Sequence, residues 1–178
     1  DDIPSFDNSS MDGFAVRAED VQHADQDPVH LKLVAELPAG EPSRLVLAPN
    51  TAAQIMTGAP VPDGATAVIE QELINVRNGS IQVTLPVKMG KNIRKRGEDI
   101  RAGDVAVRKG SFLQASHLGV LASIGASSVE VYKMPKVAFF TTGNELVEIG
   151  PALPPGKIRN SNTYSLFGLI REIHCTPV

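Results

Sequence analysis

The chain is poor in cysteine, in long apolar runs and in positive charge, and each shortage excludes a class of protein. Its single cysteine, Cys175, cannot build an internal disulfide framework or a cysteine-rich metal cluster. No apolar run approaches the roughly 18 residues that a membrane-spanning helix needs, so we expect no membrane partner. The net charge of −3 argues against nucleic acid as a partner, because nucleic-acid binders carry a basic surface.

Two further kinds of site are also missing from the sequence. The four histidines are scattered without the spacing of zinc ligands. Neither a phosphate-loop lysine motif nor a dinucleotide-binding glycine fingerprint is present. What remains is a chain of 178 residues, 42% of them apolar, which suits one or two globular domains. It starts without methionine and stops where a strand is predicted to begin, at residues 175–178, so we expect a piece of a longer protein.

A loop rich in proline and glycine separates two apolar segments within residues 54–72. Proline fixes φ and glycine permits positive φ, so this loop is expected to hold one bent, stiff shape. Either it only joins two buried strands, or it presents Thr57 and nearby backbone N–H groups to a ligand. Asp12, which precedes Gly13 in a polar segment, poses the same choice: it is a turn former or a carboxylate held for a ligand or cation.

Residues 14–98 are predicted to form a β-rich domain. Asn78-Gly79 lies between two short apolar stretches and is the strongest hairpin signal in the chain. The strands expected from the apolar pattern are 14–17, 31–37, 45–47, 52–56, 67–76 and 81–83.

A basic segment, residues 88–101, holds six of the 17 Lys and Arg residues of this acidic chain. Arg94 and Arg96 are two positions apart, so on a strand they share one face. Two guanidinium groups on one face suit phosphate or another tetrahedral oxyanion. The alternative is a solvated surface with local charge pairing, and the adjacent Glu98 and Asp99 could provide the partners.

From residue 102 onward the chain is predicted to form further strands and two helices, and its composition shifts at residue 136. Strands are predicted at 102–108 and 128–132, with a helix over 114–124 that ends at Gly125. Residues 136–142 form an almost continuous apolar run, as in a strand that is covered on both faces. A helix from Asn160 or Ser161 to His174 should follow and turn four side chains inward: Leu166, Leu169, Ile170 and Ile173.

This order of strand, helix and strand predicts the start of a parallel α/β domain. Ligands of such sheets gather at the carboxyl ends of the strands, where Glu145 follows the first strand. Alternatively, Glu145 is only a solvated side chain in a long loop.

Four motifs together resemble one family. They are FDNSSMDGFAVR (6–17), IMTGAPVPDGATAVIEQE (55–72), NIRKRGEDIRAGD (92–104) and TTGNEL (141–146). In this order and spacing the chain resembles the molybdopterin molybdenumtransferases, a family that includes the E domain of gephyrin. The family would usually have Asp at position 144, where this chain has Asn, so only a role for that charge is in doubt.

The resemblance implies an enzyme of molybdenum cofactor biosynthesis. Such enzymes insert molybdate into adenylylated molybdopterin and release AMP in a Mg²⁺-dependent step. By motif position, the catalytic residues implied are Asp12, Thr57, Asp99 and Glu145. Arg94 and Arg96 suit molybdate, a tetrahedral dianion. Asp99 and Glu145 suit Mg²⁺, which prefers oxygen ligands.

The resemblance also implies a multidomain protein of mixed α and β class that works as a cytoplasmic homodimer. We expect a discontinuous linker domain from residues 1–13 and 99–134, a β-rich domain over 14–98, and the truncated start of an α/β molybdopterin-binding-like domain over 135–178. Because half of its pocket would be missing, this chain alone is expected to be inactive.

Three other functions stay open at the sequence level. One is a partner-binding scaffold of the gephyrin E-domain type, which the presence of all four acidic and hydroxyl positions disfavours. A second is an α/β protein of the molybdopterin adenylyltransferase or competence-damage-inducible type, in which the first 130 residues would be unexplained. The third is a β-rich domain with an α/β appendage whose short motifs carry no assignable function.

Overall fold

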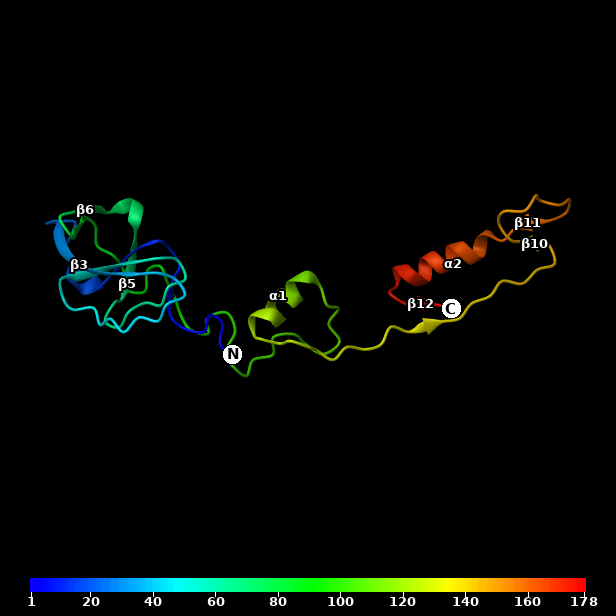
Figure 1. Cartoon of the computed structure of the whole chain (residues 1–178), viewed down its shortest axis with the longest axis horizontal. Helices are drawn as coiled ribbons and strands as arrows, with labels where there is room; N and C mark the ends of the chain where they lie inside the picture. Colours follow the sequence, from blue (N-terminus) through cyan, green and yellow to red (C-terminus); the bar gives the residue numbers. More distant parts are fainter. The chain divides into compact units, whose positions relative to one another are not determined.

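The computed structural model describes all 178 residues, which divide into two compact units, Asp1–Ser127 and Ser128–Val178 (Figure 1). The first unit contains a six-stranded sheet, and the second contains one helix with short pairs of parallel strands. No helix of the chain combines the length and the apolar character that crossing a bilayer requires.

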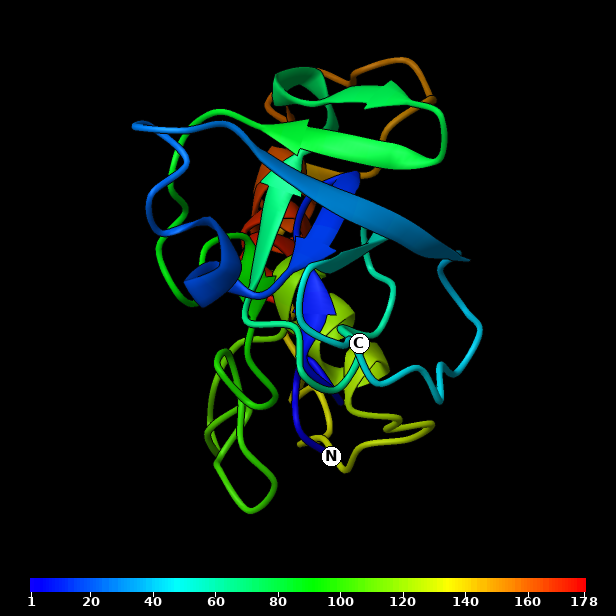
Figure 2. The same cartoon turned by 90° about the vertical axis from the view of Figure 1, so that its left-hand side faces the viewer.

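Six strands of the first unit form one sheet in the order β5-β2-β4-β3-β7-β6 (Figure 2). Their bounds are β2 Gly13–Val16, β3 Val29–Leu37, β4 Thr51–Ile55, β5 Ala67–Glu70, β6 Asn75–Arg77 and β7 Ser80–Val83. All neighbours pair antiparallel except β3 and β4, which are parallel. The β-rich character predicted for this part of the chain is confirmed.

Strand β2 is buried along its whole length because it lies between β5 and β4 and is covered on both faces. Phe14 and Val16 belong to one apolar cluster, together with Leu31 of β3. Ala15 points to the other face and packs in a second cluster with Ile55 of β4. Alternate side chains of β2 therefore pack into two separate cores. Together these cores fix the position of the residues that precede and follow the strand.

The β6–β7 hairpin has the turn that the sequence predicts. Asn78 and Gly79 both have positive φ, 51° and 71°, which the two central residues of a tight type I′ turn require. Glycine reaches this region without steric cost, and asparagine is among the side chains that tolerate it best.

Shorter elements complete the first unit. Strand β1 (Asn8–Ser9) pairs antiparallel with β8 (Ile93–Arg94), and two 3₁₀ turns, η1 and η2, span Ala18–Val21 and Gln71–Leu73. Helix α1 covers Ala115–Ser123. Gly125 has a φ of 79°, and its N–H donates to the Ala122 carbonyl at 3.0 Å, which confirms the predicted end of this helix.

In the second unit the strands β9 (Lys136–Val137) and β12 (Thr176–Pro177) pair in parallel, and helix α2 (Ser161–Glu172) precedes β12 in the chain. A second parallel pair joins β10 (Leu146–Val147) to β11 (Ile158–Arg159). Asn160 caps α2 as predicted, because its Oδ1 accepts hydrogen bonds from the N–H and the hydroxyl of Thr163, at 3.4 and 3.0 Å.

Several predicted strands are wrong. Residues 102–108 turn instead, because the Asp104 N–H donates to the Arg101 carbonyl and Gly103 has a φ of 97°. Residues 128–132 find no partner strand, and Val46 makes only a single bridge to Asp63. The strand expected over 67–76 is interrupted by η2, and that over 136–142 shrinks to β9.

The inward face predicted for α2 is also wrong for three of its four residues. Only Ile170 is buried, whereas Leu166, Leu169 and Ile173 are exposed. The four positions recur at helical spacing, but the second unit covers only Ile170 among them.

Candidate functional site

Asp12 stands at the end of a tightly built turn that leads from β1 into β2. The buried Ser9 hydroxyl donates to the Met11 carbonyl at 2.6 Å and closes this turn. The Asp12 carbonyl accepts a hydrogen bond from the Gln71 N–H at 3.1 Å, which ties it to the end of β5. The backbone of Asp12 is therefore fixed from two sides.

Gly13 explains why glycine follows this aspartate. A Cβ at position 13 would lie 2.0 Å from the carbonyl oxygen of Ile69, well inside any real contact. The backbones of β2 and β5 therefore lie closer together here than they could if residue 13 had a side chain. Since Gly13 pairs with Glu70 and Ile55 in the sheet, this close approach sets where Asp12 lies.

The proline- and glycine-rich loop is docked on β1 by backbone hydrogen bonds in both directions. The Gly58 N–H donates to the Ser9 carbonyl at 2.8 Å, and the Ser9 N–H donates to the Ala59 carbonyl at 3.0 Å. Gly58 has a φ of 82°, which only glycine adopts readily. These hydrogen bonds hold the loop against β1 and set the position of Thr57.

These two turns bring Asp12 and Thr57 together. Asp12 Oδ1 accepts a hydrogen bond from the Thr57 N–H at 2.7 Å and another from the Thr57 hydroxyl at 2.6 Å. The hydroxyl bond first, and the N–H bond second, hold the pKa of Asp12 below its ordinary value. The second carboxylate oxygen, Oδ2, accepts no hydrogen bond from the protein and faces solvent.

The basic segment meets the same strand from its other side. Arg94 is paired with Asn8, and the Ser10 N–H donates to the Asn92 carbonyl at 3.0 Å. Strand β1 therefore lies between the Thr57 loop and the basic segment. The role of Ser9 as a common anchor was missed from the sequence, where only the run of short polar residues around it gave a signal.

Arg94 is held by two carboxylates of its own segment. Its Nε donates to Glu98 Oε1 at 2.9 Å, and its Nη2 contacts Asp99 Oδ2. Glu98 and Asp99 raise the pKa of Arg94 further above its ordinary value. In turn, the Lys95 N–H and the Arg94 guanidinium lower the pKa of Glu98. The side chain of Asp99 remains half exposed beside this cluster.

Arg96 does not share a face of a strand with Arg94, and that prediction is wrong. Strand β8 ends at Arg94, and Arg96 lies in the turn that Gly97, with a φ of 69°, completes. Its guanidinium pairs with Asp2, while its backbone N–H donates to Asp7 Oδ1 at 2.8 Å. Each arginine thus has its own carboxylate partner, and charge pairing is the state observed.

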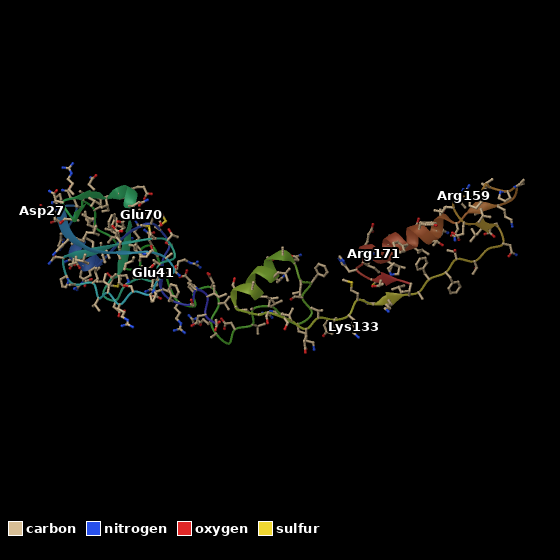
Figure 3. All side chains as sticks on the ribbon, in the orientation of Figure 1. Asp27, Glu41, Glu70, Lys133, Arg159 and Arg171 are labelled. Carbon is tan, nitrogen blue, oxygen red and sulfur yellow. The ribbon has the colours of Figure 1, made fainter.

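Further ion pairs surround the segment. Lys95 Nζ contacts Asp7 Oδ2 at 2.7 Å, and this pair lowers the pKa of Asp7. Lys91 Nζ lies 3.0 Å from Glu70 Oε2. Glu70, which is labelled in Figure 3, ends β5. The basic segment is consequently clamped to the N-terminal residues and to the sheet by side chains as well as by backbone.

Glu145 belongs to the second unit. Its backbone carbonyl accepts a hydrogen bond from the Ile158 N–H at 2.8 Å, where β10 and β11 begin to pair. Its exposed carboxylate folds back on Gly143, so that a Cβ there would lie 2.5 Å from Glu145 Oε1. Arg159, at the end of β11, donates to the Glu148 and Pro151 carbonyls (Figure 3).

The structure therefore joins Asp12 with Thr57, and Arg94 with Asp99. Arg96 is bound separately to Asp2, and Glu145 stands in the other compact unit. No group of three or more His, Cys, Asp or Glu side chains is placed to hold a metal ion.

Comparison with known proteins places these motifs in one family. The profile of the family described as the MoeA N-terminal region (domain I and II) matches residues 1–125. Molybdopterin molybdenumtransferase 2 of Mycobacterium tuberculosis is 41% identical over 171 residues, which cover 96% of this chain and 42% of that relative. Molybdopterin molybdenumtransferase of a Nostoc species is 38% identical over 178 residues, covering 99% of this chain and 41% of the relative.

Solved structures agree with the sequence comparison. The molybdopterin biosynthesis MoeA protein of Pyrococcus horikoshii is 37% identical and superposes with a TM-score of 0.92, covering 99% of this chain and 48% of that one. The chain thus spans about two fifths of the length of the curated relatives it matches. On these grounds the chain belongs to the MoeA family, and its residues 1–125 correspond to that family's N-terminal region.

Proposed function

We propose that this chain is part of a molybdopterin molybdenumtransferase, an enzyme of molybdenum cofactor biosynthesis. The whole protein would insert molybdate into adenylylated molybdopterin and release AMP. Membership of the MoeA family and the names of the relatives support this proposal. The observation that carries it is the bond between Asp12 and Thr57, since two motifs distant in sequence converge there on an exposed carboxylate.

The chemistry of the Asp12–Thr57 pair fits a positioning role. Because Thr57 stabilises the ionised form, Asp12 stays negatively charged near neutral pH and can accept further hydrogen bonds through Oδ2. A transfer of molybdate to a nucleotide-activated substrate depends mainly on positioning and charge stabilisation. Asp12 and Thr57 would therefore orient substrate groups and bring no covalent nucleophile.

Arg94 and Arg96 retain free donors for an oxyanion. A guanidinium has five N–H donors, whereas Arg94 uses Nε and Nη2, and Arg96 uses Nε, on their carboxylate partners. In this proposal the remaining N–H groups bind molybdate, and the carboxylates hold the two forks in place. Because each arginine is already paired with a carboxylate, the site would favour an anion that displaces the carboxylate or binds beside it on the remaining N–H groups.

Asp99 and Glu145 are the proposed Mg²⁺ ligands. Mg²⁺ in phosphate chemistry is commonly bound by one or two carboxylates, with phosphate oxygens and water as the other ligands. The carboxylate oxygens of these exposed side chains fit that requirement. Neither side chain belongs to a group of three or more potential metal ligands. A bound Mg²⁺ would supply neutralisation of the charge on the departing phosphate.

The proposal extends to the architecture of the whole enzyme. It comprises a linker domain from residues 1–13 and 99–134, a β-rich domain over 14–98 and the truncated start of an α/β domain over 135–178. The parallel pairing of β9 with β12 across α2 supports the last of these. The enzyme would act as a homodimer in the cytoplasm, and this chain alone would be inactive.

Release of AMP tests the proposed function. The full-length protein is mixed with adenylylated molybdopterin and Mg²⁺, molybdate is added, and AMP is measured for the wild type and for Glu145→Gln. Molybdate-dependent release that collapses in the variant supports the reaction and the role of Glu145. Equal release by both would remove Glu145 from the site, and absence of release from a folded wild-type protein would contradict the reaction itself. The same assay on the 178-residue chain should give no turnover.

A further inference from the structure

One face of the β3–β7–β6 end of the sheet carries only polar side chains. The pairing places them in two rows across the three strands. Figure 2 shows the blue β3 beside the green β7, with β6 on the other side of β7. Directly paired residues point to the same side of a sheet, so all six side chains share one face. The rows are His30, Gln82 and Asn75, and Lys32, Ser80 and Arg77.

On β3 and β7 the opposite face is core, whereas Val76 of the edge strand β6 is exposed. Leu31 and Ile81 are fully buried, and Val83 is nearly so. Because side chains alternate along a strand, the two polar rows must face solvent. Their position is therefore set by the same packing that builds the sheet.

This polar face is hollowed. A cavity of about 180 Å³ is lined by His30, Asn75, Arg77, Ser80 and Gln82. The short Ser80 side chain lies in the middle of its row, between Arg77, which lines the cavity, and Lys32, which does not. Neighbouring strands are about 4.8 Å apart, so the two cations stand roughly 10 Å apart at their backbones, with Ser80 between them.

Arg77 in this hollow is not neutralised by the protein, and neither is Lys32 in the same row. Some cations of the first unit pair with a carboxylate, among them Arg17, Lys91 and Arg94, whereas others, such as Arg44 and Arg108, do not. Arg77 and Lys32 make no ion pair or hydrogen bond through their side chains, and no carboxylate lines the cavity. What distinguishes this place is a concave surface free of carboxylates that the unpaired Arg77 lines, with the unpaired Lys32 in the same row.

We propose that this hollow is a binding site for a phosphate group. Arg77 offers a planar fork of donors and Lys32 a mobile ammonium, the two kinds of cation that bind phosphate most often. Ser80, Asn75 and Gln82 add hydroxyl and amide donors that make no hydrogen bond within the protein. The site uses none of the residues assigned to molybdate insertion, so it stands independently of that function.

Protection of a sheet edge is the alternative explanation. Strand β6 is at the edge of the sheet, and charged side chains there discourage pairing with another molecule. Edge protection accounts for Arg77 but not for Lys32 of the interior strand β3, nor for the exclusion of carboxylates. The two explanations also differ in what they predict for added phosphate.

Titration of the 178-residue chain with inorganic phosphate, followed by ¹H–¹⁵N NMR at constant ionic strength, tests the proposal. The expected result is saturable shifts of the amide signals of β3, β6 and β7 around the hollow. Arg77→Gln should weaken this binding about tenfold, the loss of one charge-assisted hydrogen bond. Arg108→Gln is the matched control, because Arg108 is exposed and its side chain has no partner; it should change the affinity less than about twofold.

A parallel titration with methyl phosphate identifies the source of the group. Tighter binding of methyl phosphate assigns the site to a phosphate ester, and tighter binding of inorganic phosphate assigns it to the free ion. Shifts that fail to saturate, shifts elsewhere in the chain, or equal effects of Arg77→Gln and Arg108→Gln would overturn the proposal. Since Arg77 is exposed on an edge strand, its replacement leaves the core untouched and a loss of binding is not a loss of folding.

Discussion

Asp12 and Thr57 are 45 positions apart in sequence, yet one carboxylate oxygen of Asp12 accepts both the N–H and the hydroxyl of Thr57. The contact joins the end of the β1–β2 turn to the loop after β4. Both turns are anchored on Ser9 or beside it, so the pair is held by backbone hydrogen bonds that do not involve either side chain. The geometry of the pair is therefore a property of the fold.

Replacing Thr57 with Val should raise the pKa of Asp12 toward its ordinary value. The variant removes the hydroxyl bond, the larger of the two causes that lower this pKa, and leaves the N–H bond. A carbon-detected NMR titration of the Asp12 carboxyl measures the shift. Thr57→Ser keeps a hydroxyl and serves as the control. An unchanged pKa in Thr57→Val would mean that the N–H bond alone holds the carboxylate.

Gly13→Ala should destabilise the first unit by about 1–3 kcal/mol, the usual cost of forcing an extra methyl group into a packed site. The added Cβ would collide with the Ile69 carbonyl, which is backbone and cannot turn away. Urea denaturation gives the free energy of unfolding.

Gly119→Ala is the matched control for that measurement. Gly119 lies within α1, and a Cβ there would meet nothing within 4 Å. The same substitution should stabilise this helix by about 0.5–1 kcal/mol, because alanine loses less backbone entropy on folding than glycine. Equal effects of the two substitutions would contradict the close approach of β2 to β5.

Asp7→Asn should flatten the loss of stability in acid. The Lys95 ammonium and then the Arg96 N–H lower the pKa of folded Asp7, so its contribution is present above the unfolded pKa of about 3.9 and is lost as the pH falls through the folded pKa. The pair is partly solvated, which limits the effect to less than about 1 kcal/mol.

The check is the free energy of unfolding measured at pH 7 and at successive steps below pH 4. Asp25→Asn provides the comparison, because the exposed Asp25 side chain makes no ion pair or hydrogen bond. If both variants keep the acid dependence of the wild type, the Asp7–Lys95 pair contributes nothing to stability.

Local signals in the sequence predicted local structure well. The Asn78-Gly79 turn, the cap at Asn160 and the glycine end of α1 each depend on one or two residues and their own backbone, and the structure has all three. The bend of the Thr57 loop follows in the same way from Gly58, whose φ is 82°.

The pairing of strands that are distant in the chain could not be predicted from the sequence. Nothing in the apolar pattern shows that β3 pairs parallel with β4, or that β1 lies between the Thr57 loop and the basic segment. The strands expected at 102–108 and 128–132 failed because alternation needs a partner strand, and none is supplied. Arg96 was misplaced for a similar reason, since Asp2 attracts it from the far end of the chain.

The most direct test of the account measures molybdate-dependent AMP release by the full-length protein carrying Asp12→Asn. We predict a loss of about a hundredfold with the fold intact, because the amide cannot accept both Thr57 donors through one charged oxygen and misplaces the group that positions the substrate. Asp27→Asn, at an exposed carboxylate without a side-chain partner (Figure 3), should release AMP like the wild type. Wild-type release by Asp12→Asn would contradict the assignment of the Asp12–Thr57 pair to the active site.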